Sequence, residues 1–130
     1  MDHTRALVPG QLYHVYGRGN NRESIFYGSQ DYRLFHCLMW EHVDPLAEIH
    51  AYAYLPNHFH LIVRIRDADD LSESIRDHVS QPFSNWLNAY VRRTNRGRGR
   101  VGALFQRPFG RVPVRDEAHL RVLGVYVHIN

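Results

Sequence analysis

The sequence predicts one α+β domain over residues 1–130, with a ferredoxin-like (RRM-like) antiparallel sheet, helices packed on one face and a further helix at the C-terminus. The order of the expected elements carries this prediction: strand, helix, two strands, helix, strand and final helix. Length and composition support it, because 130 residues that are 44% hydrophobic can bury one core but have no room for two.

The first half of the chain has the clearest periodicities. A strand is expected near residues 11–17 and a helix over about 30–43. A hairpin follows, with arms over about 48–54 and 58–66. Its turn is expected at 55–57, where proline and asparagine favour a reversal of the chain. The residues that define one face of the helix are Leu34, Phe35, Leu38, Met39 and His42.

A long helix is expected in the second half, where apolar residues recur at helical spacing from 75 to 90. Asp70 and Glu73 have the spacing of a capping box, in which two side chains bond to backbone N–H groups of the first turn. Pro82 has no backbone N–H to donate, so it is expected to kink or split this helix.

The last part of the chain predicts short strands at about 103–107 and 110–114, and then a helix from Leu120 to Asn130. Tyr126 and Asn130 are four residues apart on that helix and therefore share a face. A tyrosine and an asparagine near a C-terminus are more often ordinary surface or core residues. They gain interest only if other parts of the chain supply a site.

The hairpin supplies such a site, because His58 and His60 alternate on a strand and should point to the same face. The apolar residues that should point the other way and anchor the strand are Phe59, Leu61 and Val63. Neutral imidazoles bind divalent metals, but two are too few ligands, and the amide oxygen of Asn130 could complete the set. In a chain with ten histidines, chance alone also produces this spacing, so a site without metal stays open.

The charge of the chain fits a nucleic-acid partner. The formal net charge is +3, and all sixteen basic residues are arginines. The absence of lysine from the sequence excludes Schiff-base chemistry. Arginine forks suit phosphate contacts and stacking on bases, although a GC-rich genome explains an arginine bias equally well.

Five arginines lie within the nine residues 92–100, with glycines between them. We interpret this tract as an exposed, mobile loop, either a solvated linker or a basic arm on the DNA backbone. The segment 17–22 is a second candidate for DNA contact. Its glycines lack the third position of a dinucleotide fingerprint, so it is interpreted as a DNA-contacting turn.

The compartment is expected to be intracellular. Apolar runs all fall short of the roughly twenty residues that span a bilayer, and a secretory pattern is missing at the start. Cys37 is the single cysteine and cannot form an internal disulfide, so we expect a reducing environment and a core position for this residue.

Two segments together resemble the HUH single-tyrosine transposases of the insertion-sequence-200-like superfamily, and most closely the REP-associated tyrosine transposases. They are Pro-Asn-His-Phe-His-Leu-Ile-Val at 56–63 and Tyr-Val-His-Ile-Asn at 126–130. Weaker similarities extend over most of the chain. They are Tyr13-His14-Val15, Arg18 to Arg22, Ile25-Phe26, Asp31 and Leu104 to Arg107.

The resemblance implies a metal-dependent endonuclease and transposase acting on single-stranded DNA. In this family the paired histidines hold a metal that polarises the scissile phosphate, and a tyrosine forms a 5′-phosphotyrosine. By position, Tyr126 is the expected nucleophile, and His58 and His60 are the expected ligands. Asn130 lies where other single-tyrosine transposases have a glutamine ligand. The family also leads us to expect a proline and further residues beyond it, as in a truncated chain.

Chemistry narrows the cofactor and the partners. Phosphate and amide oxygens suit Mg²⁺ or Mn²⁺, while imidazoles favour Mn²⁺ or Zn²⁺, so we expect Mg²⁺ or Mn²⁺ as the working ion. The expected partner is single-stranded or hairpin DNA in the bacterial cytoplasm, near the nucleoid, with no membrane and with a homodimer as an open alternative to a monomer. The expected DNA-binding residues are Arg18, Asn20, Arg22, Arg92, Arg93, Arg96, Arg98, Arg100 and Arg107.

Two other functions remain open at this point. One is a binding protein for single-stranded or hairpin DNA repeats that does not cleave DNA. This alternative stays open because residue 130 is an asparagine instead of a glutamine and because the sequence ends there. The other is a small metal hydrolase that activates water, although the sequence has no carboxylate near the paired histidines to serve as a ligand.

Overall fold

The computed structural model of the protein describes residues 6–115 and 128–129. The strands pair antiparallel in one sheet of order β4-β1-β3-β2-β5. The first four strands and the two long helices follow the ferredoxin-like order, which confirms the expected α+β class. The elements are β1 (Leu12–Arg18), η1 (Asn20–Arg22), α1 (Ser29–Val43), β2 (Ala47–Leu55), β3 (His58–Ile65), η2 (Ala68–Asp70), α2 (Glu73–Asp77), α3 (Gln81–Arg98), β4 (Gly110–Pro113) and β5 (His128–Ile129).

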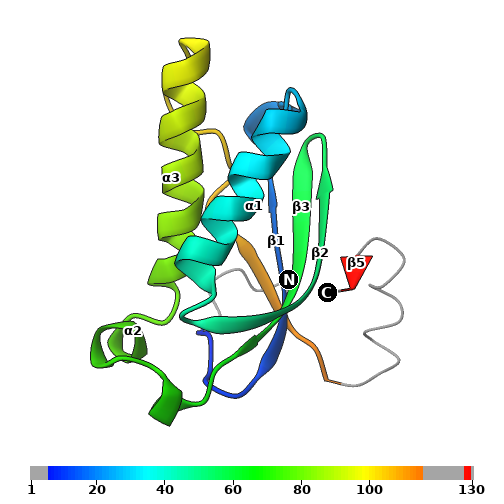
Figure 1. Ribbon diagram of the computed structural model, residues 1–130. Coiled ribbons are helices and arrows are strands. Elements are labelled where there is room, and N and C mark those ends of the chain that lie inside the picture. Colours follow the sequence, from blue (N-terminus) through cyan, green and yellow to red (C-terminus); the bar gives the residue numbers. More distant parts are fainter. Residues whose placement is uncertain (1–5, 116–127, 130) are drawn as a thin grey trace.

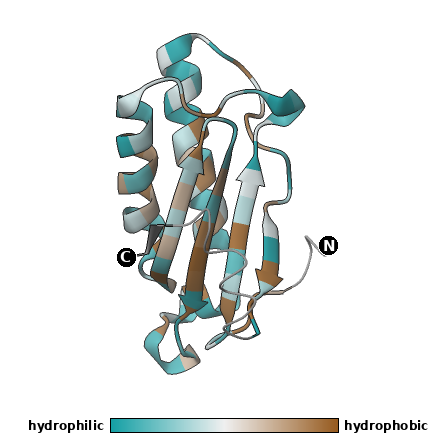
Figure 2. Cartoon of the chain, turned by 90° about the vertical axis from the view of Figure 1, so that its right-hand side faces the viewer, coloured by the Kyte–Doolittle hydropathy of each residue, from teal (hydrophilic) through white to brown (hydrophobic). Residues whose placement is uncertain are grey.

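Helices α1 and α3 pack side by side on one face of the sheet (Figure 1). The core lies between these layers, and alternate residues of β3 point into it: Phe59, Leu61 and Val63 are each 0% exposed. Trp86 of α3 is fully buried and donates from Nε1 to the carbonyl oxygen of Phe35 in α1, at 3.0 Å. The expected anchoring of the histidine strand is therefore confirmed. We call the opposite side of the sheet the distal face (Figure 2).

The first half of the chain agrees with expectation. The strand near 11–17, the helix over 30–43 and both hairpin arms are all present within one or two residues of their expected bounds. Alternate residues of β3 are buried against the helices. In β2, Ala47 and Ile49 lie in the same core, and Tyr52 and Tyr54 pack against it. A register shift between Ile49 and Ala51 interrupts the pairing of β2 with β3.

The expected long helix is divided in two. Helix α2 ends at Asp77 and α3 begins at Gln81, with Pro82 in the first turn of α3, where its missing N–H costs nothing. The expected cap at Asp70 is wrong, because Asp70 lies in η2. Ser72 caps α2 instead, and its hydroxyl oxygen accepts from the Ile75 N–H.

The arginine-rich tract does not form the expected mobile loop. Helix α3 continues through it to Arg98 and ends at Gly99, whose φ of 63° is left-handed, with the Gly99 N–H bonded to the Asn95 oxygen. The reason is tertiary packing, since Tyr90 and Thr94 are buried on the inner side of this helix. Of the described helices, none combines the length and apolar character that crossing a bilayer requires.

The segment after α3 forms one of its two expected strands. Strand β4 matches the expected strand at 110–114, while 103–107 contributes only an isolated bridge between Phe105 and Gly19. Cys37 is exposed on α1, so its expected core position is wrong. Its neighbours Phe35 and Leu38 are the buried residues of this turn of α1, while Cys37 itself is on the exposed side of the helix.

The expected C-terminal helix is wrong for its described residues. His128 and Ile129 form β5, an edge strand that pairs with Tyr52 and Ala51 of β2. An edge strand offers unpaired backbone groups, and β5 takes up those of β2 at this point. Tyr126 and Asn130 lie outside the described residues.

Candidate functional site

The site forms on the distal face, where β1 and β3 run side by side. Arg18 pairs with His58, and Tyr16 pairs with His60, in the antiparallel register of these two strands. The side chains of His58 and His60 share this face as expected, and their ring centroids lie 5.0 Å apart. Both strands are central in the sheet, so the positions of these side chains are set by pairing on each side.

His58 is oriented by its neighbour Asn57. The Nδ1 atom of His58 lies 2.8 Å from the side-chain oxygen of Asn57, which can only accept. Nδ1 therefore carries the proton in the neutral ring, and Nε2 keeps its lone pair. Metal-bound histidines commonly have their other nitrogen held in this way, because the bond fixes both tautomer and ring direction.

His60 has a partner that the sequence interpretation missed. Its Nδ1 atom lies 2.8 Å from Nε2 of His14, which is 9% exposed on β1, and the two rings stack. For His60 to bind a metal through Nε2, its Nδ1 must donate to His14. His14 is two residues before Tyr16 and so shares its face, a signal visible in the sequence once β1 and β3 are known to be neighbours.

Burial is the main electrostatic effect at this site. It lowers the pKa of His58 below its ordinary value, with a smaller contribution from the nearby positive charge of Arg18. It also lowers the pKa of His60 to about 4, with smaller contributions from His58 and Arg18. Both rings are therefore neutral at pH 7, the form in which histidine binds metals.

The chemistry of the two histidines fits a divalent metal, but the described residues do not complete a site. In 6–115 and 128–129, no group of three His, Cys, Asp or Glu side chains is arranged to hold an ion. The expected third ligand, Asn130, and the expected nucleophile, Tyr126, cannot be positioned from the described residues. An amide oxygen and phosphate oxygens are the additional ligands that this pair would need.

The loop after β1 is bonded to the hairpin turn that precedes His58. The Gly19 N–H donates to the Asn57 oxygen at 3.0 Å, and the Ile25 N–H donates to the Pro56 oxygen at 2.7 Å. These bonds hold the loop after β1 against the hairpin turn. Between them, Asn21 and Arg22 adopt left-handed backbone conformations, with φ of 55° and 59°.

A cavity of about 500 Å³ opens beneath this loop, beside His58. Arg18 and Arg22 are both exposed and line it. Two guanidinium groups beside a candidate metal ligand favour the binding of an anion here. A phosphate can bond to the guanidinium groups and to a metal ion at the same time. The remaining lining residues are Gly19, Asn57, His58 and Gln106.

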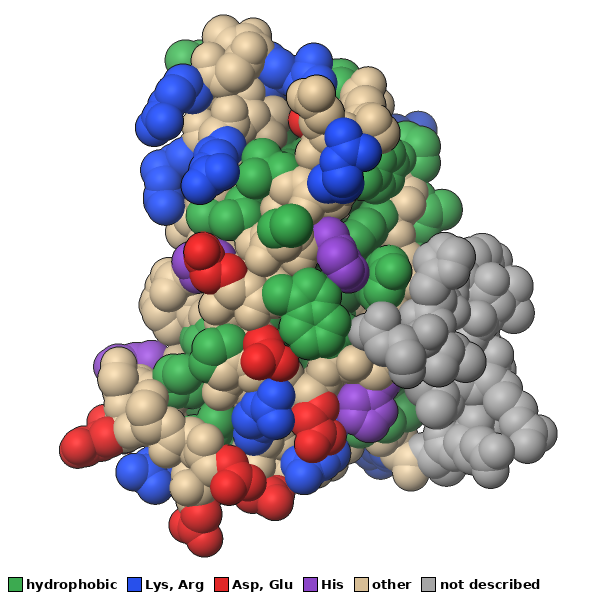
Figure 3. Space-filling model, in the orientation of Figure 1, with side chains coloured by type: hydrophobic (Ala, Val, Ile, Leu, Met, Phe, Trp, Pro, Cys, Tyr) green, Lys and Arg blue, Asp and Glu red, His purple; other side chains and the backbone are tan. Residues whose placement is uncertain are grey.

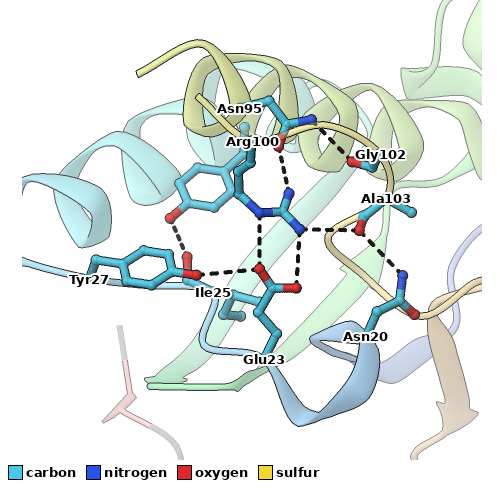
Figure 4. Close-up of polar contacts among 9 residues, drawn as sticks. Asn20, Glu23, Ile25, Tyr27, Asn95, Arg100, Gly102 and Ala103 are labelled. Atoms are coloured by element: carbon cyan, nitrogen blue, oxygen red, sulfur yellow. Dashed lines mark hydrogen bonds and ion pairs between the residues drawn. The ribbon is translucent and has the colours of Figure 1, made fainter. Parts of the chain in front are cut away.

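Two arginines of the tract are held by acidic side chains. Arg100 forms a bidentate pair with Glu23, at 2.9 and 3.1 Å, and Asn95 accepts from the same guanidinium (Figure 4). Arg98 bonds to Asp31 at 2.9 Å. The Arg98 contact ties the end of α3 to the first turn of α1, and the Arg100 contact ties the residues after α3 to the loop after β1. Both arginines therefore hold the structure around the site, whether or not they also touch DNA.

The other expected DNA-binding residues are available on the surface. Arg92, Arg93 and Arg96 are exposed on α3, and Arg107 is exposed before β4. Asn20 is half-buried and donates to the Ala103 oxygen at 3.4 Å. Figure 3 shows arginines gathered at the end of the molecule where α3 terminates, and acidic side chains at the opposite end, around α2. The exposed acidic residues there are Asp67, Asp69, Asp70, Glu73 and Asp77.

Comparisons with known proteins bear on the fold. No protein-family model and no curated protein matches the chain. A similar solved structure is that of the REP-associated tyrosine transposase bound to a REP hairpin, with a TM-score of 0.67 and 17% identity, covering 95% of this chain and 67% of that one. The likeness shows a shared fold. At this identity it does not extend to activity or partners, which have to be argued from the site.

Proposed function

We propose that this chain is a metal-dependent endonuclease and transposase for single-stranded or hairpin DNA, acting through a 5′-phosphotyrosine. The observation that carries the proposal is the pair His58 and His60 on a central strand, each with Nδ1 bonded to a neighbouring side chain. The bond to Asn57 leaves Nε2 of His58 with its lone pair, and Nε2 of His60 has the same state when Nδ1 donates to His14, which is the state that a metal ligand requires. The fold shared with a tyrosine transposase bound to a hairpin supports it.

The residues of this chain would divide the work as follows. His58, His60 and Asn130 would hold Mg²⁺ or Mn²⁺, which when bound polarises the scissile phosphate. The Tyr126 hydroxyl gives up its proton and its oxygen forms a bond to phosphorus, while the bond from phosphorus to the 3′ oxygen breaks. The 3′ oxygen takes up a proton and leaves as a 3′-hydroxyl. Rejoining is the reverse, so the covalent link keeps the phosphodiester energy and needs no ATP.

Arg18 gives the site its preference for a phosphate. Its charge lies close enough to His58 and His60 to help lower their pKa values, and the same charge would disfavour a bare cation there. A phosphodiester between the guanidinium and the ion relieves this repulsion. Metal and DNA are therefore expected to bind more tightly together than either does alone.

The test is a cleavage assay with hairpin-bearing oligonucleotides and Mn²⁺ or Mg²⁺. Wild-type protein should form a covalent adduct that denaturing gels detect, and Tyr126→Phe should form none. His58→Ala and His60→Ala should lose cleavage but retain binding, while His78→Ala, at an exposed histidine at the end of α2, should behave as wild type. Equal cleavage by Tyr126→Phe would refute the assignment of the nucleophile.

A homodimer in which each tyrosine serves the other chain is a separate proposal. A mixture of Tyr126→Phe and His58→Ala chains should then regain cleavage, because one of the mixed sites has both groups intact. Lack of any recovery in the mixture, with both variants folded, would mean that each chain uses its own tyrosine.

A second candidate function is a DNA-binding protein that does not cleave. It is favoured by one observation: among the described residues, no group of three His, Cys, Asp or Glu side chains is arranged to hold a metal ion. Tight oligonucleotide binding with no adduct under any divalent metal would support this alternative. Water incorporation into a cleaved product without a tyrosine link would instead indicate a metal hydrolase.

A further inference from the structure

The ring of Tyr16 has a specific place on the distal face. Its centroid lies 5.1 Å from that of His14 and 6.4 Å from that of His60. The ring rests against Gly110 of β4, its partner in the sheet, where a Cβ atom would overlap the ring. Glycine at 110 therefore allows the tyrosine to lie along the sheet, close to the paired histidines.

Tyr16 lines a cavity of about 410 Å³ that adjoins the one beside His58. Arg18 and Gln106 line both cavities and so form the wall between them. That wall is fixed by a backbone bond of 2.8 Å from the Gln106 N–H to the Arg18 oxygen. Arg107 lines the Tyr16 side only.

The chemistry of this second cavity suits an unpaired base. Its volume lies within the range of pockets that hold small ligands, and it contains an aromatic ring on which a base can stack. The Gln106 amide can both donate to and accept from a base edge, and Arg107 can donate. Arg18, at the boundary, can bind the phosphate that links this base to the strand at His58.

We propose that this cavity holds one unpaired base of the DNA strand, stacked on Tyr16, from the nucleotide adjoining the phosphate at His58 and His60. This inference rests on the proposed function and adds to it a base-specific position next to the cleaved bond. Gln106 is the residue that distinguishes one base from another there. Strand sequence at this position then affects binding, in addition to any hairpin.

The test uses oligonucleotides with a hairpin and a single-stranded tail in which 2-aminopurine is moved one position at a time. Binding is measured by anisotropy of an end label, and stacking by quenching of the 2-aminopurine fluorescence. Wild-type protein should quench at one tail position. Tyr16→Leu should lose that quenching and bind about 5- to 100-fold more weakly, as loss of one stacked base predicts.

Three further variants make the result specific. Tyr16→Phe should retain the quenching, because the ring is kept, and Tyr27→Leu should retain it too, because Tyr27 is an exposed tyrosine outside both cavities. Gly110→Ala should lose it, because the added Cβ displaces the ring without removing it. This last variant serves as the test if Tyr16→Leu does not fold.

The possible results separate the two proposals. Three results would each overturn the base cavity and leave the proposed function standing. The first is binding without quenching at any tail position, and the second is quenching that persists in Tyr16→Leu and Gly110→Ala. The third is loss of quenching in Tyr16→Phe. If the wild-type protein binds none of the oligonucleotides, the proposed function itself fails, and the base cavity fails with it.

Discussion

The Nε2 atom of His14 lies 2.8 Å from the Nδ1 atom of His60, and their rings stack with centroids 5.0 Å apart. One nitrogen of this pair must donate and the other accept, so the protonation states of the two rings are linked. Binding of a metal by Nε2 of His60 requires the proton on Nδ1 and an acceptor at His14. His14 therefore belongs to the site, although it is not among the expected ligands.

Replacing His14 tests this link. His14→Phe removes the acceptor and leaves the Nδ1–H of His60 without this partner, so the affinity for Mn²⁺ should fall about 10- to 100-fold. His14→Gln, whose amide oxygen can accept, should lose less. The affinity is measured by Mn²⁺ titration with electron paramagnetic resonance detection. An unchanged affinity in folded His14→Phe would show that His14 has no part in orienting His60.

The Arg100 and Glu23 pair should matter for stability. The Arg100 side chain is 16% exposed and binds both carboxylate oxygens of Glu23, so Arg100→Ala should cost about 1–3 kcal/mol in the free energy of unfolding. Arg96→Ala, at an exposed position near the end of α3, should stay within about 0.5 kcal/mol of wild type. Urea unfolding compares the two. Equal stabilities would mean that the pair contributes nothing net.

The exposed arginines of α3 should act on DNA binding and leave stability unchanged. If Arg92, Arg93 and Arg96 bind phosphates, each alanine substitution should reduce the slope of log K against log salt by about 0.7 for a single strand. Thermal unfolding of the alanine variants should match wild type. Arg76→Ala, at the acidic end of the molecule, is the matched control. A slope that stays the same in the triple variant would remove this helix from the DNA-binding surface.

His36 should be a neutral histidine with a defined tautomer. Its Nε2 accepts from Trp40 Nε1–H at 3.1 Å, so Nδ1 must carry the proton toward the Tyr54 oxygen at 2.8 Å. Burial lowers its pKa below the ordinary value. Proton NMR should find a titration midpoint below about 6.5 and the Nδ1–H tautomer at pH 7.5.

The lowered pKa of His36 determines how this residue affects stability as the pH changes. Because the unfolded chain takes up the proton at a higher pH than the folded one, the contribution of His36 is fully present above about pH 6.5. It is lost as the pH falls through the folded pKa. The loss of stability between neutral and acidic pH should therefore be smaller in His36→Gln than in wild type. An equal loss in both proteins would contradict the assignment.

Local patterns were enough for the sheet and for the two histidines. Alternation along 58–65 indicates a strand with one buried face, and this alone puts His58 and His60 on the other face. Local composition gave the wrong structure for the arginine tract, which was expected to be a loop but is mostly the end of α3. Its partners Asp31 and Glu23 are 67 and 77 residues away from Arg98 and Arg100, and no local rule anticipates such contacts.

The sequence by itself determined the ferredoxin-like order of elements and the face that carries the paired histidines, because hydrophobic periodicity is a local property and burial enforces it. Only the tertiary structure decided that His14 orients His60, that Arg100 holds Glu23, and that Tyr16 and Gln106 border one cavity. The physical reason is that each of these relations joins segments that are distant along the chain, and the distances between these segments are set by sheet register and packing.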